Sequence, residues 1–214
     1  MTFKNVVIFG DSYSTYEGAN PEGYAVYYKK QQAEDSPWPM SINETWWHPL
    51  LSETNSNLVI NDSWSGSTIG YTGYNGEDLS QTCSFIKRLR NYEEKGFFND
   101  KEVDTVFILG GTNDNWAGAP IGEIKYENWE EKDLYSFLPA FCYFVDKAKE
   151  VFKKAEIIVI ISGALKGVMR DGMKEVCHHH NMRYVEFKNF DQLYGHPTAK
   201  GMKDIKDQII EGLK

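Results

Sequence analysis

The stretch that decides the fold runs Val6-Val7-Ile8-Phe9-Gly10-Asp11-Ser12. Four consecutive apolar residues, three of them β-branched, predict a short strand that is buried on both faces. The glycine permits a tight turn at the end of this strand, and the serine then opens the next segment with its hydroxyl at the rim of the sheet. Ser12 is therefore a candidate nucleophile, although a serine after a strand is also a common helix N-cap.

More short apolar runs predict strands of the same kind. They lie at residues 58–60, 106–109 and 157–161, with a weaker run around Tyr184 and Val185. Helical patterns separate them, at residues 45–51, 79–89, 134–152, 165–177 and after Thr198. Apolar strands that alternate with helices predict an α/β fold, with a mostly parallel sheet covered on both faces.

The composition fits one domain that spans residues 1–214. Hydrophobic residues make up 41% of the chain and charged residues 25%, enough for a full-sized core. Neither an internal repeat nor a linker divides the chain. The segment 13–42 shows no regular helix or strand pattern and is expected to be a long loop. A loop of this length is usually functional or mobile. Whether it closes over a substrate or supports a subunit contact stays open.

The net charge and the hydropathy of the chain argue against some classes of binding partner. Twenty-three Lys and Arg against 31 Asp and Glu give a net charge of −8, which argues against binding of nucleic acid or of an anionic membrane surface. The longest apolar run is far shorter than the roughly 20 residues that cross a bilayer. The N-terminus lacks a basic n-region and a long h-region, so we expect a cytoplasmic protein unless a signal peptide has been removed.

Glycine and small polar residues follow the predicted strands, where the ligands of such folds bind. A serine nucleophile needs a base, and the best candidate is His196, just before the last helix. It also needs donors for the oxyanion, which the N–H groups of Ser12 and Gly66 and the side-chain amide of Asn113 could supply. Loss of one such donor typically costs roughly 3 to 4 kcal/mol of transition-state stabilisation.

Four blocks of the sequence, in this order, resemble those of the SGNH or GDSL-like hydrolases. The blocks are residues 6–14, 61–66, 110–114 and 195–197. The resemblance implies a flavodoxin-like three-layer α/β/α fold with a mostly parallel five-stranded sheet. It also implies ester hydrolysis through an acyl-enzyme, with Ser12 as nucleophile, His196 as general base, Gly66 and Asn113 as oxyanion donors, and no metal or organic cofactor.

One departure from the family concerns the acid of the triad. The family usually carries an aspartate three residues before the histidine, where this chain has Leu193, and Asp191 stands five residues before His196. If the residues between them form a turn, Asp191 reaches Nδ1 of the histidine. If they do not, a backbone carbonyl orients the ring and the site is a Ser-His dyad.

Aromatic residues in the loops next to these blocks suggest the substrate. The candidate substrate contacts are the aromatic residues Tyr13, Trp64 and Trp116, together with Asp11 beside the serine. Aromatic rings at a pocket rim stack on sugars or bury acyl chains. About half of the loop aromatics are expected to pack on the core instead. The run 178–180, three histidines, is no metal site, because consecutive helical residues point about 100° apart.

These observations together predict a serine esterase that acts on a small-molecule ester. A small acyl group, with an O-acetylated carbohydrate as the preferred substrate, is the first expectation. The alternatives are a lipase or thioesterase for longer acyl chains and a glycan-binding member of the fold without turnover. The sequence does not address the oligomeric state.

Overall fold

A five-stranded parallel sheet forms the centre of the protein. The structure is a computed structural model that describes residues 2–30 and 35–214. The strands are β1 (Asn5–Gly10), β2 (Asn57–Ser63), β3 (Thr105–Leu109), β4 (Glu156–Ser162) and β5 (Arg183–Phe187). Their order across the sheet is β2-β1-β3-β4-β5, and all neighbours are parallel. The predicted α/β fold is confirmed.

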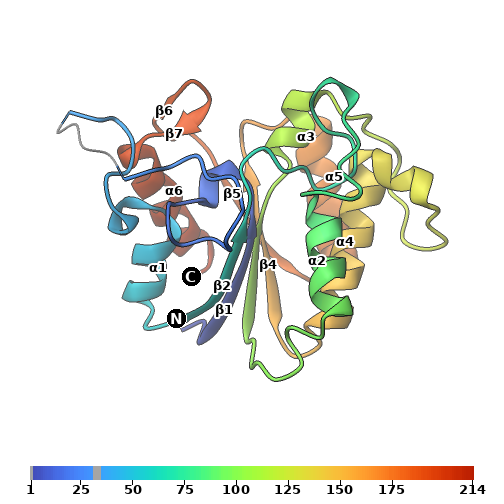
Figure 1. Cartoon of the computed structure of the whole chain (residues 1–214), viewed down its shortest axis with the longest axis horizontal. Helices are drawn as coiled ribbons and strands as arrows, with labels where there is room; N and C mark the ends of the chain where they lie inside the picture. Colours follow the sequence, from blue (N-terminus) through green and yellow to red (C-terminus); the bar gives the residue numbers. More distant parts are fainter. Residues whose placement is uncertain (1, 31–34) are drawn as a thin grey trace.

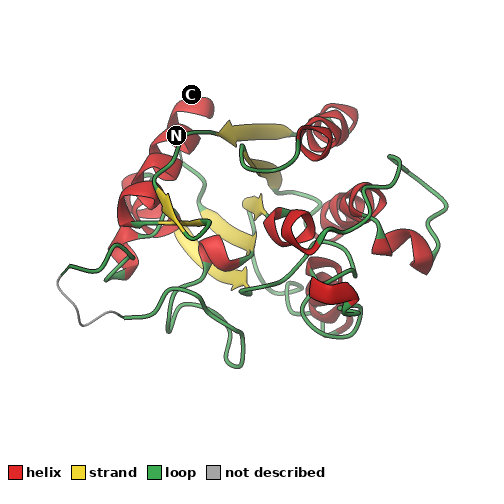
Figure 2. Cartoon of the chain, turned by 90° about the horizontal axis from the view of Figure 1, so that it is seen from above, coloured by secondary structure: helices red, strands yellow, loops and turns green. Residues whose placement is uncertain are grey.

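Helices cover both faces of this sheet (Figures 1 and 2). The helices α1 (Trp47–Glu53) and α6 (Ala199–Gly212) lie on one face. The other face carries α2 (Phe85–Glu94), α4 (Phe137–Val151) and α5 (Gly167–His179), with the short α3 (Thr112–Ala117) above them at the carboxyl ends of the strands. The longest helix in the described part of the chain is α4, with 15 residues, and no helix there is long and apolar enough to cross a membrane.

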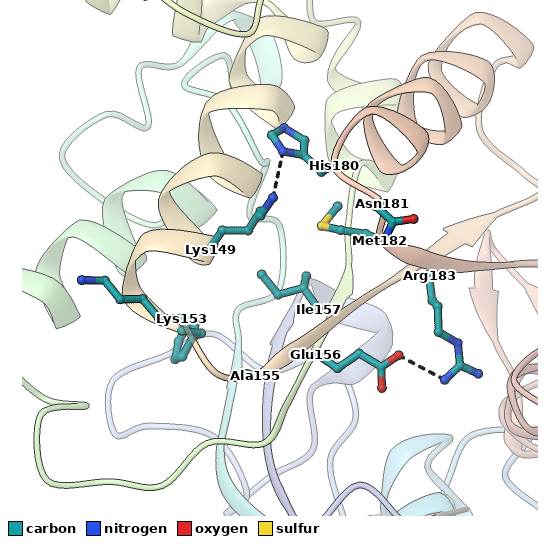
Figure 3. Close-up of a pocket in the computed structure, with 10 residues that line it drawn as sticks. Lys149, Lys153, Ala155, Glu156, Ile157, His180, Asn181, Met182 and Arg183 are labelled. Carbon is teal, nitrogen blue, oxygen red and sulfur yellow. Dashed lines mark hydrogen bonds and ion pairs between the residues drawn. The ribbon is translucent and has the colours of Figure 1, made fainter.

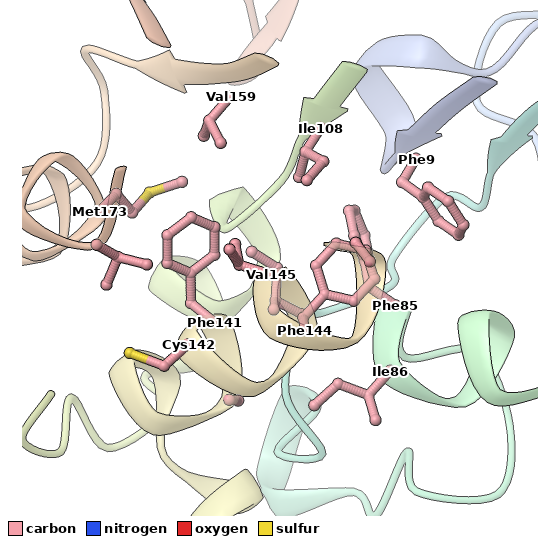
Figure 4. Packing of buried hydrophobic residues seen from close by; sticks show 14 of the residues in the cluster. Phe9, Phe85, Ile86, Ile108, Phe141, Cys142, Phe144, Val145, Val159 and Met173 are labelled. Carbon is pink, nitrogen blue, oxygen red and sulfur yellow. The ribbon is translucent and has the colours of Figure 1, made fainter. Parts of the chain in front are cut away.

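The core is divided by the sheet into two apolar layers. In β1, Val7 and Phe9 belong to one layer, whereas Val6 and Ile8 belong to the other, because successive side chains of a strand point to opposite faces. Figure 4 shows the layer under α2, α4 and α5, where Phe144 packs edge-on against Phe9. Loss of such a buried Phe typically costs about 3–5 kcal/mol.

The strand order explains where a site can form. From β1 the chain turns one way to β2 and then crosses to β3 on the other side, so the topological switch point lies between β1 and β3. Loops that leave the carboxyl ends of these two strands diverge there and open a crevice. Ser12 follows β1 and Asn113 follows β3, and the topology therefore brings these two residues together.

Three local features differ from the sequence-based expectation. The helix predicted over 79–89 begins only at Phe85, because Ser84 is its N-cap and its hydroxyl accepts a hydrogen bond from the N–H of Lys87. The helix α3 and the antiparallel hairpin of β6 (Gln192–Leu193) and β7 (His196–Pro197) were not predicted. Each is too short to show a hydrophobic period.

The long segment 13–42 lies against this hairpin. The hydroxyl of Tyr28 donates to the carbonyl of Pro197, and the N–H of Ala199 donates to the carbonyl of Pro37. Residues 31–34 of this segment lie outside the described part of the chain. Short 3-10 turns complete the fold: Ser12–Ser14, Ile42–Glu44, Tyr74–Gly76 and Glu131–Tyr135.

Candidate active site

Ser12 and His196, 184 positions apart in the sequence, are hydrogen-bonded to each other. The distance between Ser12 Oγ and His196 Nε2 is 3.1 Å. Ser12 opens the turn directly after β1, and His196 opens β7, just before α6. This distance lies within the reach that proton transfer between a nucleophile and its base requires.

The turn that carries Ser12 is fixed by its two preceding residues. The carboxylate of Asp11 caps it by accepting a hydrogen bond from the N–H of Tyr13, at 3.0 Å. A Cβ on Gly10 would lie 2.7 Å from Cβ of Ser14, so this position has no room for a side chain. Gly10 is thus required for a close approach of the chain rather than for an unusual backbone angle.

His196 has the tautomer that a general base needs. Its Nδ1 lies 3.2 Å from the carbonyl oxygen of Tyr194. A carbonyl only accepts hydrogen bonds, so Nδ1 carries the proton and the lone pair of Nε2 faces Ser12. Burial lowers the pKa of His196 below its ordinary value, while the bond to Tyr194 opposes that shift; the net lowering favours the neutral, basic form.

Asp191 does not occupy the place of a triad acid. Its carboxylate accepts a hydrogen bond from the hydroxyl of Thr198, and its carbonyl accepts one from the N–H of the same residue. Thr198 is in turn the N-cap of α6, since its hydroxyl accepts from the N–H of Gly201. Nδ1 of His196 contacts the backbone carbonyl of Tyr194 and not the carboxylate of Asp191. This is the second of the two arrangements that the sequence left open.

Three aromatic rings surround the imidazole of His196. Tyr27 stacks on it, with 3.6 Å between the ring centroids and 3° between the planes. Trp116 meets it edge-on at 5.5 Å, and Tyr13 lies at 5.8 Å. The histidine is therefore held between side chains from the segment 13–42 and from α3.

Asn113 lies in α3 with both ends of its amide bonded. Its Nδ2 donates to the carbonyl of Ser67 at 2.9 Å, and its Oδ1 accepts from the hydroxyl of Tyr74 at 2.7 Å. These two bonds fix which way the amide points. Because an amide nitrogen carries two hydrogens, the second remains for an acceptor on a substrate.

Gly66 lies in a tight turn after β2. The N–H of Ser67 donates to the carbonyl of Trp64, and Gly66 between them has a φ of 86°, which glycine adopts without strain. Asp114 anchors the continuation of this loop, because its carboxylate accepts from the N–H groups of Ile69 and Gly70. The loop that follows the second sequence block is joined to the third block in this way.

A buried ion pair lies beneath the same loops. The guanidinium of Arg88 pairs with the carboxylate of Asp62, and both side chains are almost fully buried. Arg88 also donates to the carbonyl of Gly10 and to the hydroxyl of Ser67. One side chain of α2 thus holds together the ends of β1 and β2 and the loop that contains Gly66.

The candidate substrate contacts divide into buried and exposed residues. One carboxylate oxygen of Asp11 caps the turn, and the other is buried without a hydrogen-bond partner among the described residues. Tyr13 is fully buried, and its hydroxyl donates to the carbonyl of Gly195, so it supports the histidine loop instead. Trp64 is half-buried beside Tyr24, at 4.2 Å between ring centroids, whereas Trp116 is 41% exposed.

The three consecutive histidines make different sets of contacts. His179 stacks on Tyr126, His178 lies beside Tyr184, and Nδ1 of His180 lies 3.2 Å from Nζ of Lys149. Figure 3 shows the last contact in a pocket of about 430 Å³ at the amino ends of β4 and β5. Ser12, in contrast, follows the carboxyl end of β1, so this pocket and Ser12 lie at opposite ends of the parallel strands.

The sequence did not identify Tyr27 and Tyr74 as residues of the site. Tyr74 was one of several loop aromatics, and Tyr27 was one of five tyrosines in the segment 13–42. The only available signal was the density of tyrosines in a long loop between two blocks. Such a signal cannot say which ring reaches the histidine.

The fold is that of the SGNH hydrolases. The sequence matches the GDSL-like Lipase/Acylhydrolase family over residues 4–213, and the chain belongs to that family. The resemblance seen in the four blocks is thereby confirmed.

Solved structures agree with this assignment. A candidate GDSL-like lipase from Bacteroides ovatus is 36% identical, with a TM-score of 0.88 over 100% of this chain and 99% of that one. Another from Bacteroides uniformis is 37% identical, with a TM-score of 0.87 over 98% and 95%. An acetyl xylan esterase from Butyrivibrio proteoclasticus shares the fold at 15% identity, with a TM-score of 0.58 over 100% and 64%. No curated protein matched.

Proposed function

We propose that the protein is a serine esterase that hydrolyses small acyl esters through an acyl-enzyme. The hydrogen bond of 3.1 Å between Ser12 Oγ and His196 Nε2 carries this proposal. Ser12 Oγ attacks the acyl carbonyl and passes its proton to Nε2, and the protonated imidazole then returns a proton to the leaving alkoxide. A water molecule, deprotonated by the same nitrogen, cleaves the acyl-enzyme and releases the acid and the free serine.

The tetrahedral intermediates need donors for their negatively charged oxygen. Asn113 is suited to this role, because its amide is fixed by Ser67 and Tyr74 and retains one hydrogen. We assign the other two donors to the backbone N–H groups of Ser12 and Gly66. The turn geometry of Gly66 and the anchoring of its loop by Asp114 and Arg88 are consistent with this assignment.

The acyl group should be small. Ser12 is 1% exposed and Asn113 is 2% exposed, which leaves little surface for a long chain at the reacting atoms. Two aromatic residues that contact the site are exposed, Trp116 beside His196 and Tyr74 on Asn113. Such rings stack on sugars, so an O-acetylated carbohydrate is the preferred substrate; the acetyl xylan esterase that shares the fold acts on such an ester.

Hydrolysis of p-nitrophenyl acetate, octanoate and palmitoate tests the reaction and the acyl length together. We expect kcat/KM to fall steeply from acetate to palmitoate, and the Ser12→Ala variant to lose turnover of every ester. A preference for palmitoate favours the lipase or thioesterase alternative and contradicts the acetyl proposal.

A glycan-binding protein without turnover is the second candidate. The displacement of Asp191 onto Thr198 favours it, because the site then lacks the carboxylate of a triad. In that case none of the three esters is hydrolysed, although an acetylated xylo-oligosaccharide still binds to the wild-type protein.

A further inference from the structure

Among residues 2–30 and 35–214, the imidazole of His196 has one polar neighbour besides Ser12 that could orient it. This is the carbonyl of Tyr194, on the side of Nδ1. In a triad a carboxylate orients the base. Here the carboxylate of Asp191 accepts a hydrogen bond from Thr198 instead, and Leu193 stands where the family usually has an acid. A single bond to a carbonyl restrains the ring less than a buried carboxylate does, so another restraint is needed on the plane of the ring.

Tyr27 supplies a contact of that kind. Its ring lies parallel to the imidazole, with 3.6 Å between the centroids and 3° between the planes. Trp116, on a different side, meets the imidazole at 62° between the planes. A ring stacked at this distance covers one face of the imidazole and opposes tilting of the imidazole toward that side.

The backbone of Tyr27 is tied to the turn of the nucleophile. Its N–H donates to the hydroxyl of Thr15 at 2.9 Å, and that hydroxyl donates to the carbonyl of Ser12 at 3.0 Å. The stacking partner of the base is therefore positioned relative to the nucleophile through a single side chain.

Two further tyrosines hold the chain on either side of His196. The hydroxyl of Tyr13 donates to the carbonyl of Gly195 at 2.6 Å, and that of Tyr28 donates to the carbonyl of Pro197 at 2.8 Å. Both come from the same segment as Tyr27. They fix the backbone of the histidine, and Tyr27 acts on its ring.

We infer that Tyr27 is a positioning residue for His196, which restrains the imidazole plane in place of the missing carboxylate. This inference rests on the proposed function, since it assigns His196 the role of the base. It concerns the ring of Tyr27 and not its hydroxyl. A misplacement of a catalytic group by about 1 Å can cost on the order of 10²-fold in rate.

The test compares Tyr27→Leu with Tyr27→Phe in p-nitrophenyl acetate hydrolysis. We expect Tyr27→Leu to lower kcat by on the order of 10²-fold with little change in KM, and Tyr27→Phe to retain the wild-type kcat. Tyr126→Leu is the matched control, because Tyr126 also stacks on a histidine, His179, at 3.6 Å and far from Ser12. It should leave kcat unchanged. Wild-type kcat in Tyr27→Leu, or an equal loss in Tyr27→Leu and Tyr126→Leu, overturns the inference.

The proton resonances of the His196 ring give a second measurement that does not depend on turnover. The ring current of Tyr27 should shift them upfield in the wild type and in Tyr27→Phe, and Tyr27→Leu should return them toward ordinary values. Identical shifts in the wild type and Tyr27→Leu contradict the inference. If the wild type hydrolyses no ester, the proposed function fails, and these resonances still decide whether Tyr27 holds the ring.

Discussion

The carboxylate of Asp191 accepts a hydrogen bond from the hydroxyl of Thr198, the residue that caps α6, rather than from the histidine five positions along the chain. Asp191 therefore contacts the N-cap of a helix, and the carbonyl of Tyr194 lies beside Nδ1 of His196. The difference between these two roles can be measured.

Asp191→Asn should retain nearly wild-type kcat on p-nitrophenyl acetate. An amide oxygen can still accept the bond from Thr198, so the cap survives the substitution. In a triad the same substitution leaves the base in the wrong tautomer and lowers kcat by about 10⁴-fold. A loss of that size in Asp191→Asn would show that the carboxylate reaches His196 during turnover.

Asn113→Ala should lower kcat by about 10²- to 10³-fold and leave KM for p-nitrophenyl acetate nearly unchanged, because an oxyanion donor acts in the transition state. Tyr74→Phe removes the bond that orients the amide but leaves the donor, so its loss of kcat should be much smaller. Steady-state kinetics with thermal melts on all three proteins separate this effect from unfolding. Equal kcat in Asn113→Ala and the wild type would remove Asn113 from the mechanism.

Asp11 should make the protein less stable as the pH rises from about 4 to 7. Burial raises the pKa of Asp11 from 3.8 to about 7, so across this range the unfolded chain has released a proton that the folded chain keeps. Stability is then lost with rising pH, by at most about 1.4 kcal/mol per pH unit for one proton. Asp114, whose pKa burial raises to about 6, acts in the same direction over the lower part of the range.

Asp11→Asn isolates this contribution. The amide imitates the protonated carboxyl and keeps an oxygen for the N–H of Tyr13. Chemical denaturation from pH 4 to 8 should therefore show a shallower fall of the unfolding free energy in the variant, with its advantage over the wild type largest at pH 8. Parallel curves for the two proteins would mean that Asp11 is already ionised at low pH in the folded state.

Arg88→Met should destabilise the protein by about 3–5 kcal/mol, because it leaves the carboxylate of Asp62 buried without its cation. Adding Asp62→Asn removes the unpaired charge and should recover part of this loss, as urea denaturation of the single and double variants can show. The recovery should be incomplete, since Arg88 also donates to Gly10 and Ser67. No recovery at all would place the cost of Arg88→Met in the other hydrogen bonds of Arg88, which also include the carbonyls of Cys83 and Asp62, and not in the ion pair.

The sheet could be predicted from the sequence because its central strands contain continuous apolar runs. Short, β-branched runs such as 157–161 are typical of strands in a sheet covered on both faces, and this run became a strand at nearly the expected residues. The start of α2 was misjudged by six residues, since Leu79 and Cys83 are buried by turns that imitate a helical period.

The residues that orient His196 were harder to predict than the candidate reactive residues themselves. Ser12 and Asn113 stand in short motifs at the ends of parallel strands, and the topology brings such ends together. His196 stands in a short motif just before the last helix. Which side chain orients His196 depends on the path of the hairpin β6–β7 and of the segment 13–42. Neither has a hydrophobic period, so Asp191 and Tyr27 could be assigned only from the folded structure.

Covalent labelling of Ser12 tests the central claim most directly. A fluorophosphonate reacts with a serine hydroxyl that a neighbouring base activates, and mass spectrometry of the digested protein locates the adduct. We expect one phosphonyl group on Ser12 in the wild type, strongly slowed labelling in His196→Ala and none in Ser12→Ala. An unmodified Ser12 in the folded wild-type protein, or labelling that does not depend on His196, would contradict the account of a Ser-His esterase.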